Sequence, residues 1–438
     1  MPQWRAGFGE KNLSAPQLSW IAALALLLIV PRNSANAAAL QKPAHHAAVT
    51  LRHALELARR YNPDLSVVRR ELTVAKGELQ KASYLTPFNM ELAAEAGYRT
   101  RSTRSNSQDW RVGFIQEFEI FGQRGLRKKA ARIGLDASLA QLSDQTRLLD
   151  GAVRMTFYET MRARQEVELL SELARLDFNL LTAARTRLDA GEINQVEYNS
   201  AQIRYGQSHR ALIQGAERYR LLRSSLGRLL GGKAGNEPEP ADEIKVQPVQ
   251  IEIETLIEGA RRSRPDLRAR QLDVARFDTE IALNQRLNLP NPAIGMFLGH
   301  ENNTERFIGP MVGFAVPLFN RRVGEATILA GRRAQAQDQL HAAELDVEQQ
   351  VRDAYNRYMT ARQTLRVYED EVVVPARQSF GLLEAAFTEG KIDLLRLSIA
   401  EREAFEARMA YVGAWFELLA AQVAIELATG TPLETTSR

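Results

Sequence analysis

The sequence contains no cysteine among its 438 residues. This absence excludes disulfide bonds, thiolate ligands for metal ions, cysteine nucleophiles and a lipid anchor on an N-terminal cysteine. Neither sign of charge is in large excess, because 57 basic and 53 acidic residues leave a formal net charge of only +4. A nucleic-acid-binding surface needs a strong basic excess, so we expect no nucleic-acid partner.

Long apolar runs are nearly absent as well. The clear exception is Trp20–Val30, which follows the basic residues Arg5 and Lys11 and precedes the small-residue pattern Ala35–Ala37. This arrangement predicts a secretory signal peptide that is cleaved after Ala37. A membrane anchor is the weaker alternative, because a spanning helix needs about 20 apolar residues. We expect no later stretch to be long and apolar enough to span a bilayer as a helix.

Motifs typical of enzymes are missing too. The sequence has no nucleophile elbow, no His-Glu zinc motif, no phosphate-binding glycine loop and no dinucleotide fingerprint. A specific metal site needs three or four converging ligands, and the six histidines show no such spacing. We therefore predict no catalytic residue, no cofactor and no resident metal. The histidines are His45, His46, His53, His209, His300 and His341.

What the chain does contain is an internal repeat with a period of about 200 residues. Four landmarks recur in the same order and at nearly constant offset, which predicts two copies of one structural unit. Tyr61–Leu65 recurs as Ser263–Leu267, Gly113-Phe114 as Gly313-Phe314, Phe121 as Phe319, and Ala190–Ile193 as Glu389–Ile392.

The repeat divides the chain into segments that we predict as follows. They are a signal peptide at 1–37, an N-terminal segment at 38–49, a first helix–hairpin–helix repeat at 50–230, a linker at 231–254, a second repeat at 255–430 and a tail at 431–438.

Each copy is predicted to open with a helix that begins near Leu51 or Thr255 and is interrupted early by Pro63 or Pro265. Two strands with apolar residues at every second position follow, around a polar loop. Pro310 and Pro317 are expected to weaken the last strand. The predicted strands are 90–98 and 110–120 around the loop 99–109, and 294–298 and 307–319 around the loop 299–306.

A very long helix is predicted after each hairpin, at Gln123–Leu188 and Val323–Thr388. At 1.5 Å per residue each would reach about 100 Å. Heptad spacing of apolar residues indicates that these helices pack along other helices. We expect Pro375 to kink the second one, and a last helix to return antiparallel after a glycine turn at 195–230 and at 394–428. The heptad residues are Leu135, Leu139, Leu142, Leu149 and Val153 in the first copy, and Val347, Val351, Ala354, Tyr358, Ala361, Leu365, Tyr368 and Val372 in the second.

Four short amphipathic strands cannot stand alone in a membrane, because their edges leave backbone groups unpaired in hydrocarbon. A closed barrel needs eight or more strands, so closure needs at least two chains, and three would supply twelve. Aromatic residues near strand ends suit the interfacial girdles of such barrels. The predicted girdle residues are Tyr98, Trp110, Phe114, Phe121, Phe307 and Phe319.

Specific segments at the strand–helix transitions carry a family resemblance. Gln116–Arg124 and Val316–Glu325 both lead from a strand into a long helix, and Asn291-Pro292 and Val374-Pro375 are further familiar pairs. With the twofold helix–hairpin–helix pattern behind a signal peptide, they resemble the TolC-type outer-membrane efflux family. The resemblance covers residues 50–430, approximately. Within the family, these segments are similar to those of the branch that serves cobalt–zinc–cadmium and copper exporters of the resistance-nodulation-division class.

The resemblance implies a mainly α fold with a transmembrane β portion. A long α-helical barrel in the periplasm would join four β-strands per chain, which complete a 12-stranded outer-membrane barrel in a homotrimer. The partners implied are a periplasmic adaptor (membrane fusion) protein, an inner-membrane resistance-nodulation-division pump and outer-membrane lipid. The protein would be a passive conduit, not an enzyme, for divalent or heavy-metal cations. Organic-drug efflux or type I secretion is an alternative, and a soluble periplasmic coiled-coil scaffold is an alternative of another class.

The glycine turns at Gly191 and Gly390 are the first candidate sites, because such turns form the periplasmic tip in the resembled family. Their flanks, Asp189–Tyr198 and Thr388–Leu397, are expected to contact the adaptor. Many members carry acidic residues here, whereas this chain has an arginine in the second copy. We hypothesise that this arginine pairs with the glutamate of the first copy as a weak latch; two unrelated solvated charges are the alternative. The tip residues are Gly191, Glu192, Glu197, Gly390, Lys391 and Arg396.

Overall fold

The computed structural model describes residues 48–100, 102, 106–242, 252–302, 304–389, 391–392 and 394–432. The predicted signal peptide, most of the 38–49 segment, part of the linker, Gly390 and most of the tail lie outside the described residues.

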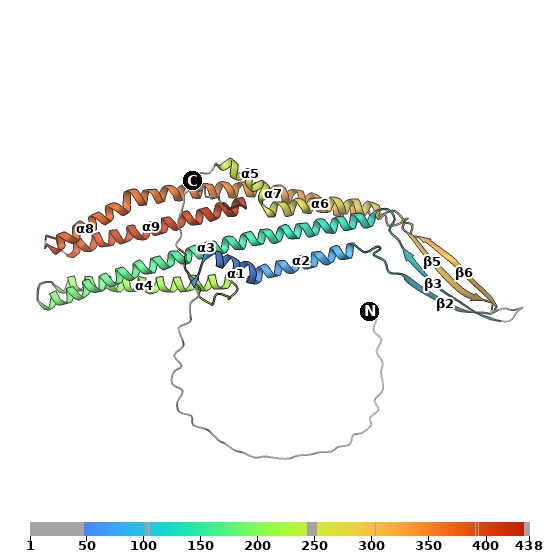
Figure 1. Ribbon diagram of the computed structural model, residues 1–438, viewed down its shortest axis with the longest axis horizontal. Helices are drawn as coiled ribbons and strands as arrows, with labels where there is room; N and C mark the ends of the chain where they lie inside the picture. The colour runs from blue at the N-terminus through green and yellow to red at the C-terminus, as the bar shows by residue number, and fades with distance from the viewer. Residues whose placement is uncertain are drawn as a thin grey trace, which may run out of the picture. The chain divides into compact units, whose positions relative to one another are not determined.

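The two longest elements of the first repeat are helices that lie side by side. Helix α3 covers Gln123–Asp189, 67 residues, which confirms the predicted long helix almost to the residue. Helix α4 covers Gln195–Leu229 and returns along α3 (Figure 1). At 1.5 Å per residue α3 is about 100 Å long. Its length therefore depends on packing against neighbouring helices rather than on helix propensity alone.

The long helix of the second repeat is interrupted, as Pro375 predicts. Helix α7 covers Val323–Val367, a π-helical turn η1 covers Tyr368–Val373, and α8 covers Val374–Thr388. Proline has no N–H and its ring clashes with the carbonyl one turn earlier. The wider π turn directly before the proline accommodates this defect without ending the helix. Helix α9, Leu394–Thr429, then packs back along α7 and α8.

The opening helix of each repeat is split at the predicted proline, and the split ties the start of the repeat to its end. In the first repeat, Asn62 accepts from the N–H of Leu65 at 3.0 Å and donates to the carbonyl of Leu229 at 3.1 Å. In the second, Arg264 donates to the carbonyl of Ala428 at 3.2 Å. The helices are α1 Leu51–Tyr61, α2 Pro63–Ala82, α5 Ile253–Ser263 and α6 Pro265–Arg286.

Arg264 is itself buried, with 6% of its surface exposed, and needs charge compensation. Its guanidinium lies 2.7 Å from the carboxylate of Asp266 and 2.6 Å from the side-chain oxygen of Gln350. Burial raises the pKa of Asp266, but the hydrogen bond and positive charge of Arg264 lower it, so the net pKa lies below its ordinary value. Asp266 therefore stays ionised at neutral pH and keeps the buried arginine paired.

The heptad prediction is confirmed from Val347 to Leu365 in the second repeat, where Tyr368 and Val372 fall in the π-helical turn and are only half-buried, and it is confirmed in part in the first repeat. In α7 the predicted positions from Val347 to Leu365 are all buried, and they pack in one cluster with Leu418 and Ile425 of α9. In α3, Leu135 and Val153 are buried, whereas Leu139 is 43% exposed. Part of the α3 stripe is thus left uncovered within one chain.

One prediction about hydropathy was wrong. The segment Arg396–Thr429 of α9 is long and apolar enough to cross a membrane by length and composition. However, 56% of its apolar window is buried inside the protein, where α9 packs against α5, α7 and α8. The apolar composition of α9 is therefore explained by its place in the helical core.

The four predicted strands form one antiparallel sheet in the order β2-β3-β5-β6. They cover Glu91–Arg99, Ser107–Glu117, Pro292–Glu301 and Glu305–Phe314. The second hairpin is tighter than the predicted 299–306 loop, because Gly299–Glu301 pairs with Glu305–Phe307. Pro310 lies in β6, which is an edge strand within one chain, the place in a sheet where proline is ordinarily found. A separate parallel pair joins β1, Ala48–Val49, to β4, Glu239–Pro240.

Glycine at position 231 is required where the first repeat closes, and its neighbour Gly232 provides a matched control. Gly231 and Gly232 both have left-handed backbone, with φ of 67° and 71°, but only at Gly231 would a Cβ lie 2.4 Å from the carbonyl oxygen of Tyr61. We expect Gly232→Ala to cost about 1–2 kcal/mol from backbone strain alone. Gly231→Ala should cost several kcal/mol, because a backbone atom cannot move away easily.

Thermal unfolding of the two purified variants in detergent, followed by circular dichroism, measures this difference. Equal midpoints for both variants would contradict the proposed closure of the repeat at Gly231.

Candidate functional site

The sheet has one continuous apolar face. Side chains alternate between faces along a strand, and directly paired residues share a face. Following the register across all four strands collects apolar side chains on one side, and most of the large ones are exposed. They are Leu92, Ala94, Ala96, Tyr98, Trp110, Val112, Phe114, Ile294, Met296, Leu298, Ile308, Pro310, Val312 and Phe314. Polar residues on this apolar face lie only toward strand ends, at Gln108, Gln116, His300 and Arg306.

The opposite face, here called the mixed face, has a different composition. It combines charged residues, glycines and a few apolar side chains. Arg99 lies 2.8 Å from Asp109, and Arg111 lies 3.8 Å from Glu301. The charged residues are Glu91, Glu95, Arg99, Asp109, Arg111, Glu117, Glu301 and Glu305. A sheet with an exposed apolar face and a charged opposite face matches the lipid side and the water side of a membrane wall.

The register separates the six predicted girdle residues. Tyr98, Trp110 and Phe114 lie on the apolar face. Phe121 and Phe319 follow the ends of β3 and β6, in the segments that lead into the long helices, and Phe319 is fully exposed. Phe307 pairs with Gly299 and therefore lies on the mixed face. The sequence prediction grouped it with the others because it counted aromatic residues without knowing the register.

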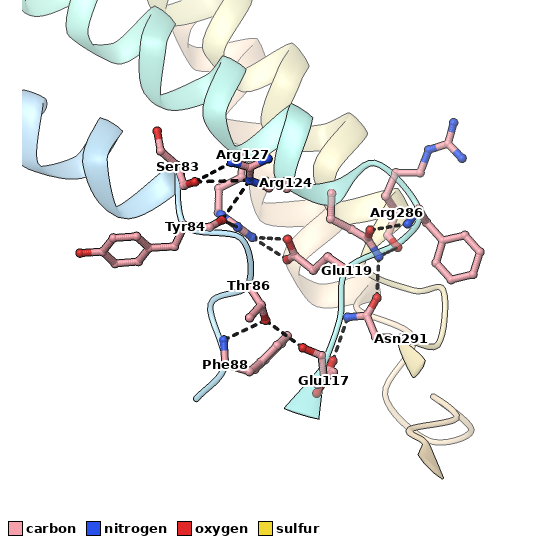
Figure 2. Close-up of polar contacts among 12 residues, drawn as sticks. Ser83, Tyr84, Thr86, Phe88, Glu117, Glu119, Arg124, Arg127, Arg286 and Asn291 are labelled. Carbon is pink, nitrogen blue, oxygen red and sulfur yellow. Dashed lines mark hydrogen bonds and ion pairs between the residues drawn. The ribbon is translucent and has the colours of Figure 1, made fainter. Parts of the chain in front are cut away.

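A buried polar cluster ties the strands to the helices (Figure 2). Gln123, the first residue of α3, is fully buried and donates to the side-chain oxygen of Asn291 at 2.8 Å. Asn291 donates in turn to the carboxylate of Glu117 at 2.8 Å. The oxygen of Gln123 also accepts from the N–H of Phe121 at 2.8 Å. These bonds join the end of β3, the start of α3 and the segment before β5.

An ion pair completes the same cluster. The carboxylate of Glu119, only 1% exposed, lies 2.5 Å and 2.7 Å from the guanidinium of Arg127. Arg127 also donates to the carbonyl of Tyr84 at 3.2 Å, and Arg124 donates to the carbonyl of Ser83 at 2.9 Å (Figure 2). The segment between α2 and β2 is thereby bound to α3. The cluster couples three of the four strand–helix connections.

The turn of the first repeat shows the expected geometry. Gly191 adopts a left-handed conformation with φ of 76°, as a reversal between antiparallel helices requires. Asn194 caps α4 by accepting from the N–H of Glu197 at 3.0 Å. Arg187 lies 3.9 Å from Glu192, and both side chains are largely exposed.

The turn of the second repeat contains Gly390, which lies outside the described residues. Lys391 lies 2.5 Å from Glu389. One contact joins the helices that follow the two turns. Arg204 of α4 lies 3.3 Å from Asp177 of α3 and 3.4 Å from the carbonyl of Ser398 in α9. The pairing of Glu197 with Arg396 stays a prediction.

Sequence reasoning missed two features. The first is the polar cluster. Its residues Glu117, Glu119 and Gln123 all lie in the motif that carries the resemblance, so the available signal was the presence of polar and charged residues among aromatic ones between a strand and a helix. The second is the closing glycine of each repeat, Gly231 and Gly430, which recur at the repeat offset and both have positive φ. Within the described ranges, no group of three histidine, aspartate or glutamate side chains is placed to hold a metal ion.

Removing the buried charge of Glu119 tests the cluster. Glu119→Gln keeps the shape of the side chain but leaves the Arg127 guanidinium, about one-fifth exposed, without its counter-charge. We expect a loss of about 2–3 kcal/mol, below the range for a fully buried pair. Hydrogen exchange should rise at residues 83–88, which Arg124 and Arg127 hold.

The matched control is Glu56→Gln, which removes the exposed pair with Arg52 and should change stability by less than about 0.5 kcal/mol. If exchange at 83–88 were the same in Glu119→Gln as in the unmodified protein, the coupling role of the cluster would be contradicted.

Comparison with known proteins is consistent with this architecture. The chain is 23% identical over 367 residues to the cobalt-zinc-cadmium resistance protein CzcC of Cupriavidus metallidurans, covering 83% of this chain and 86% of that protein. The fold is similar to that of CusC, with a TM-score of 0.72, 14% identity and coverage of 88% and 93%. It is also similar to that of the outer-membrane channel OprN, with a TM-score of 0.70, 19% identity and coverage of 87% and 89%.

A family model adds the assignment. Residues 256–431, which make up nearly all of the second repeat, match the model named Outer membrane efflux protein. The first repeat shares the order and geometry of these elements, down to the proline that splits its opening helix and the glycine that closes it. The second repeat therefore matches the outer membrane efflux protein family, and the whole chain is similar in sequence to CzcC and in fold to CusC.

Proposed function

We propose that the chain is one subunit of a trimeric outer-membrane conduit, through which a pump in the inner membrane expels divalent or heavy-metal cations. The observation that carries this proposal is the two-faced sheet, with an exposed apolar face and a charged mixed face. The conduit is passive and catalyses no reaction. The helices would stand in the periplasm and the sheet in the outer membrane.

The edges of the sheet support an oligomer. Strands β2 and β6 are the two ends of the strand order. Backbone groups on such edges need partners in hydrocarbon, where each unsatisfied group costs several kcal/mol. Three copies would pair β6 of each subunit with β2 of the next and close a barrel of twelve strands. The strands have 9 to 11 residues, the length that a tilted strand needs to cross an outer membrane.

The apolar face fits a bilayer in detail. Its centre is apolar, and polar side chains such as His300 and Arg306 lie near the hairpin ends, where headgroups and water begin. In this proposal Tyr98 and Trp110 would form the outer aromatic girdle. Phe121 and Phe319, at the ends nearest the helices, would form the inner one. The hairpin ends then face the cell exterior.

The proposed cargo rests on the relative named for cobalt, zinc and cadmium resistance, and the proposed partners rest on the resemblance to the TolC-type family. We assign this chain to the same class of cargo, with a periplasmic adaptor protein and an inner-membrane pump of the resistance-nodulation-division class as partners. The adaptor would contact the turns at Gly191 and Gly390 with their flanks, including Glu192 and Lys391. The division into repeats at 50–230 and 255–430 belongs to this proposal.

The latch hypothesis at the tip has its own test. If Glu197 and Arg396 of adjacent helices hold the turns together across the assembled tip, Arg396→Glu should open it and raise the conductance of the purified assembly. Each exposed pair contributes at most about 1 kcal/mol, so the effect should weaken with added salt. Glu192→Lys is the charge-reversal control, at the turn of the first repeat near Glu197. Unchanged conductance in Arg396→Glu would leave these as two solvated charges.

Mass and conductance together test the proposed conduit. Protein extracted from outer membranes should have the mass of three mature chains by light scattering, after the detergent contribution is subtracted. It should also form discrete pores in planar lipid bilayers. A monomer that stays in the soluble periplasmic fraction without detergent would instead support the coiled-coil scaffold.

The class of cargo needs a separate measurement. Deleting the gene that encodes this protein should lower the resistance of its host to cobalt, zinc and cadmium salts. A loss of resistance to organic drugs alone would support the drug-efflux alternative, and a loss of a secreted protein would support type I secretion.

A further inference from the structure

The mixed face carries two large aromatic side chains where charged and small residues otherwise prevail. Phe297 of β5 is paired directly with Gly309, and Phe307 of β6 is paired directly with Gly299. Each phenylalanine therefore faces a residue without a side chain. The two rings lie against each other edge to face, with centroids 5.7 Å apart.

The glycines make room for the rings. A Cβ atom added at Gly299 would lie 2.3 Å from Cζ of Phe307, and one added at Gly309 would lie 3.1 Å from Cζ of Phe297. Cζ is the outermost atom of a phenyl ring, so each ring extends along the sheet over its glycine instead of standing away from it. A side chain at position 299 would therefore overlap the Phe307 ring, and one at position 309 would crowd the Phe297 ring.

Arg111 holds the rings from the neighbouring strand. Its guanidinium carbon lies 5.4 Å from the ring centroid of Phe297 and 5.5 Å from that of Phe307. Glu301 lies 3.8 Å from the same guanidinium and orients it. A guanidinium within about 6 Å of a ring centroid is attracted to the ring face. The arginine thus favours rings that stay close to the sheet.

We propose that Gly299 and Gly309 set the open width of the conduit, because they let the rings of Phe307 and Phe297 lie against its wall. This inference rests on the proposed function, in which the mixed face lines the lumen. In a closed trimer the arrangement recurs three times at one level of the barrel. Rings displaced from the wall would project into the lumen there and narrow the pore.

The test is the single-channel conductance of purified assemblies in planar lipid bilayers. Gly299→Ala should lower the conductance roughly 1.5-fold, because three displaced rings enter the lumen. The double variant Gly299→Ala with Phe307→Ala should return it to the level of the unmodified protein or above. Gly97→Ala is the matched control: Gly97 also lies on the mixed face, and a Cβ there has no atom within 4 Å.

A second pair keeps the test independent of folding. The added Cβ at Gly299 also lies 2.9 Å from the backbone oxygen of Trp110, so this variant can disturb the sheet itself. At Gly309 the three nearest atoms all belong to the Phe297 ring. Gly309→Ala should therefore give a smaller decrease of the same sign, and Phe297→Ala should reverse it.

The outcomes separate the inference from the function on which it rests. If the unmodified protein forms pores and neither glycine variant lowers their conductance, the inference is overturned and the conduit stands. If the glycine variants lower conductance but removal of the phenyl rings does not restore it, the rings are not the cause and the inference is also overturned. If the unmodified protein forms no pores, the proposed function itself is contradicted.

Discussion

The need to pair every backbone N–H and C=O in hydrocarbon is the constraint on which the rest of this structure depends. The chain has only four strands, and their sheet ends in two open edges, at β2 and β6. In water such edges are tolerable, but in a membrane each unpaired group costs several kcal/mol. The exposed apolar face makes water equally unfavourable as the only surroundings. Both demands would be met by the proposed assembly, in which copies of the chain join edge to edge within a bilayer.

The helices extend this logic away from the membrane. Helix α3 follows β3 after residues 118–122, and α7 follows β6 after residues 315–322, so each of these helices starts close to the end of a strand. The polar cluster of Gln123, Asn291 and the Glu119–Arg127 pair fixes three of the four connections between strands and helices through hydrogen bonds and an ion pair. Such groups are costly when broken singly, which makes the connection stiff and specific. A rigid joint is what a conduit needs if force at its far end is not to distort the membrane portion.

The fold prediction rested on the spacing of apolar residues and on the internal repeat, and the limits of these two signals explain the predictions that were wrong. The heptads and the repeat located α3, α4 and α9 to within a residue or two, because long patterns average out local exceptions. The loop 299–306 was placed too wide, because Gly299 and His300 resemble turn residues while their pairing depends on the partner strand. Phe307 was assigned to the girdle because the register of β6 was not known from the sequence. A change of register by one residue moves a side chain to the other face of the sheet. The apolar composition of α9 also does not distinguish a helix that spans a membrane from a helix that is buried in a protein core.

The candidate sites were less predictable, because they depend on contacts between segments far apart in the chain. Asn291 meets Gln123 across 168 residues, and Arg111 meets Phe307 only through the order of the strands. Neither contact leaves a local pattern. The glycine turn at Gly191 was predictable, since a reversal between two long helices needs a left-handed residue at that point.

The most direct test of this account asks which solvent each face of the sheet meets. Because the sequence has no cysteine, a single introduced cysteine can be labelled without interference. Ala96 and Glu95 are neighbours in the middle of β2 and lie on opposite faces. With a fluorophore on each in turn, the account predicts that brominated lipid chains quench the label at Ala96→Cys and that aqueous iodide quenches the label at Glu95→Cys. Equal access of iodide to both positions in membranes would contradict it.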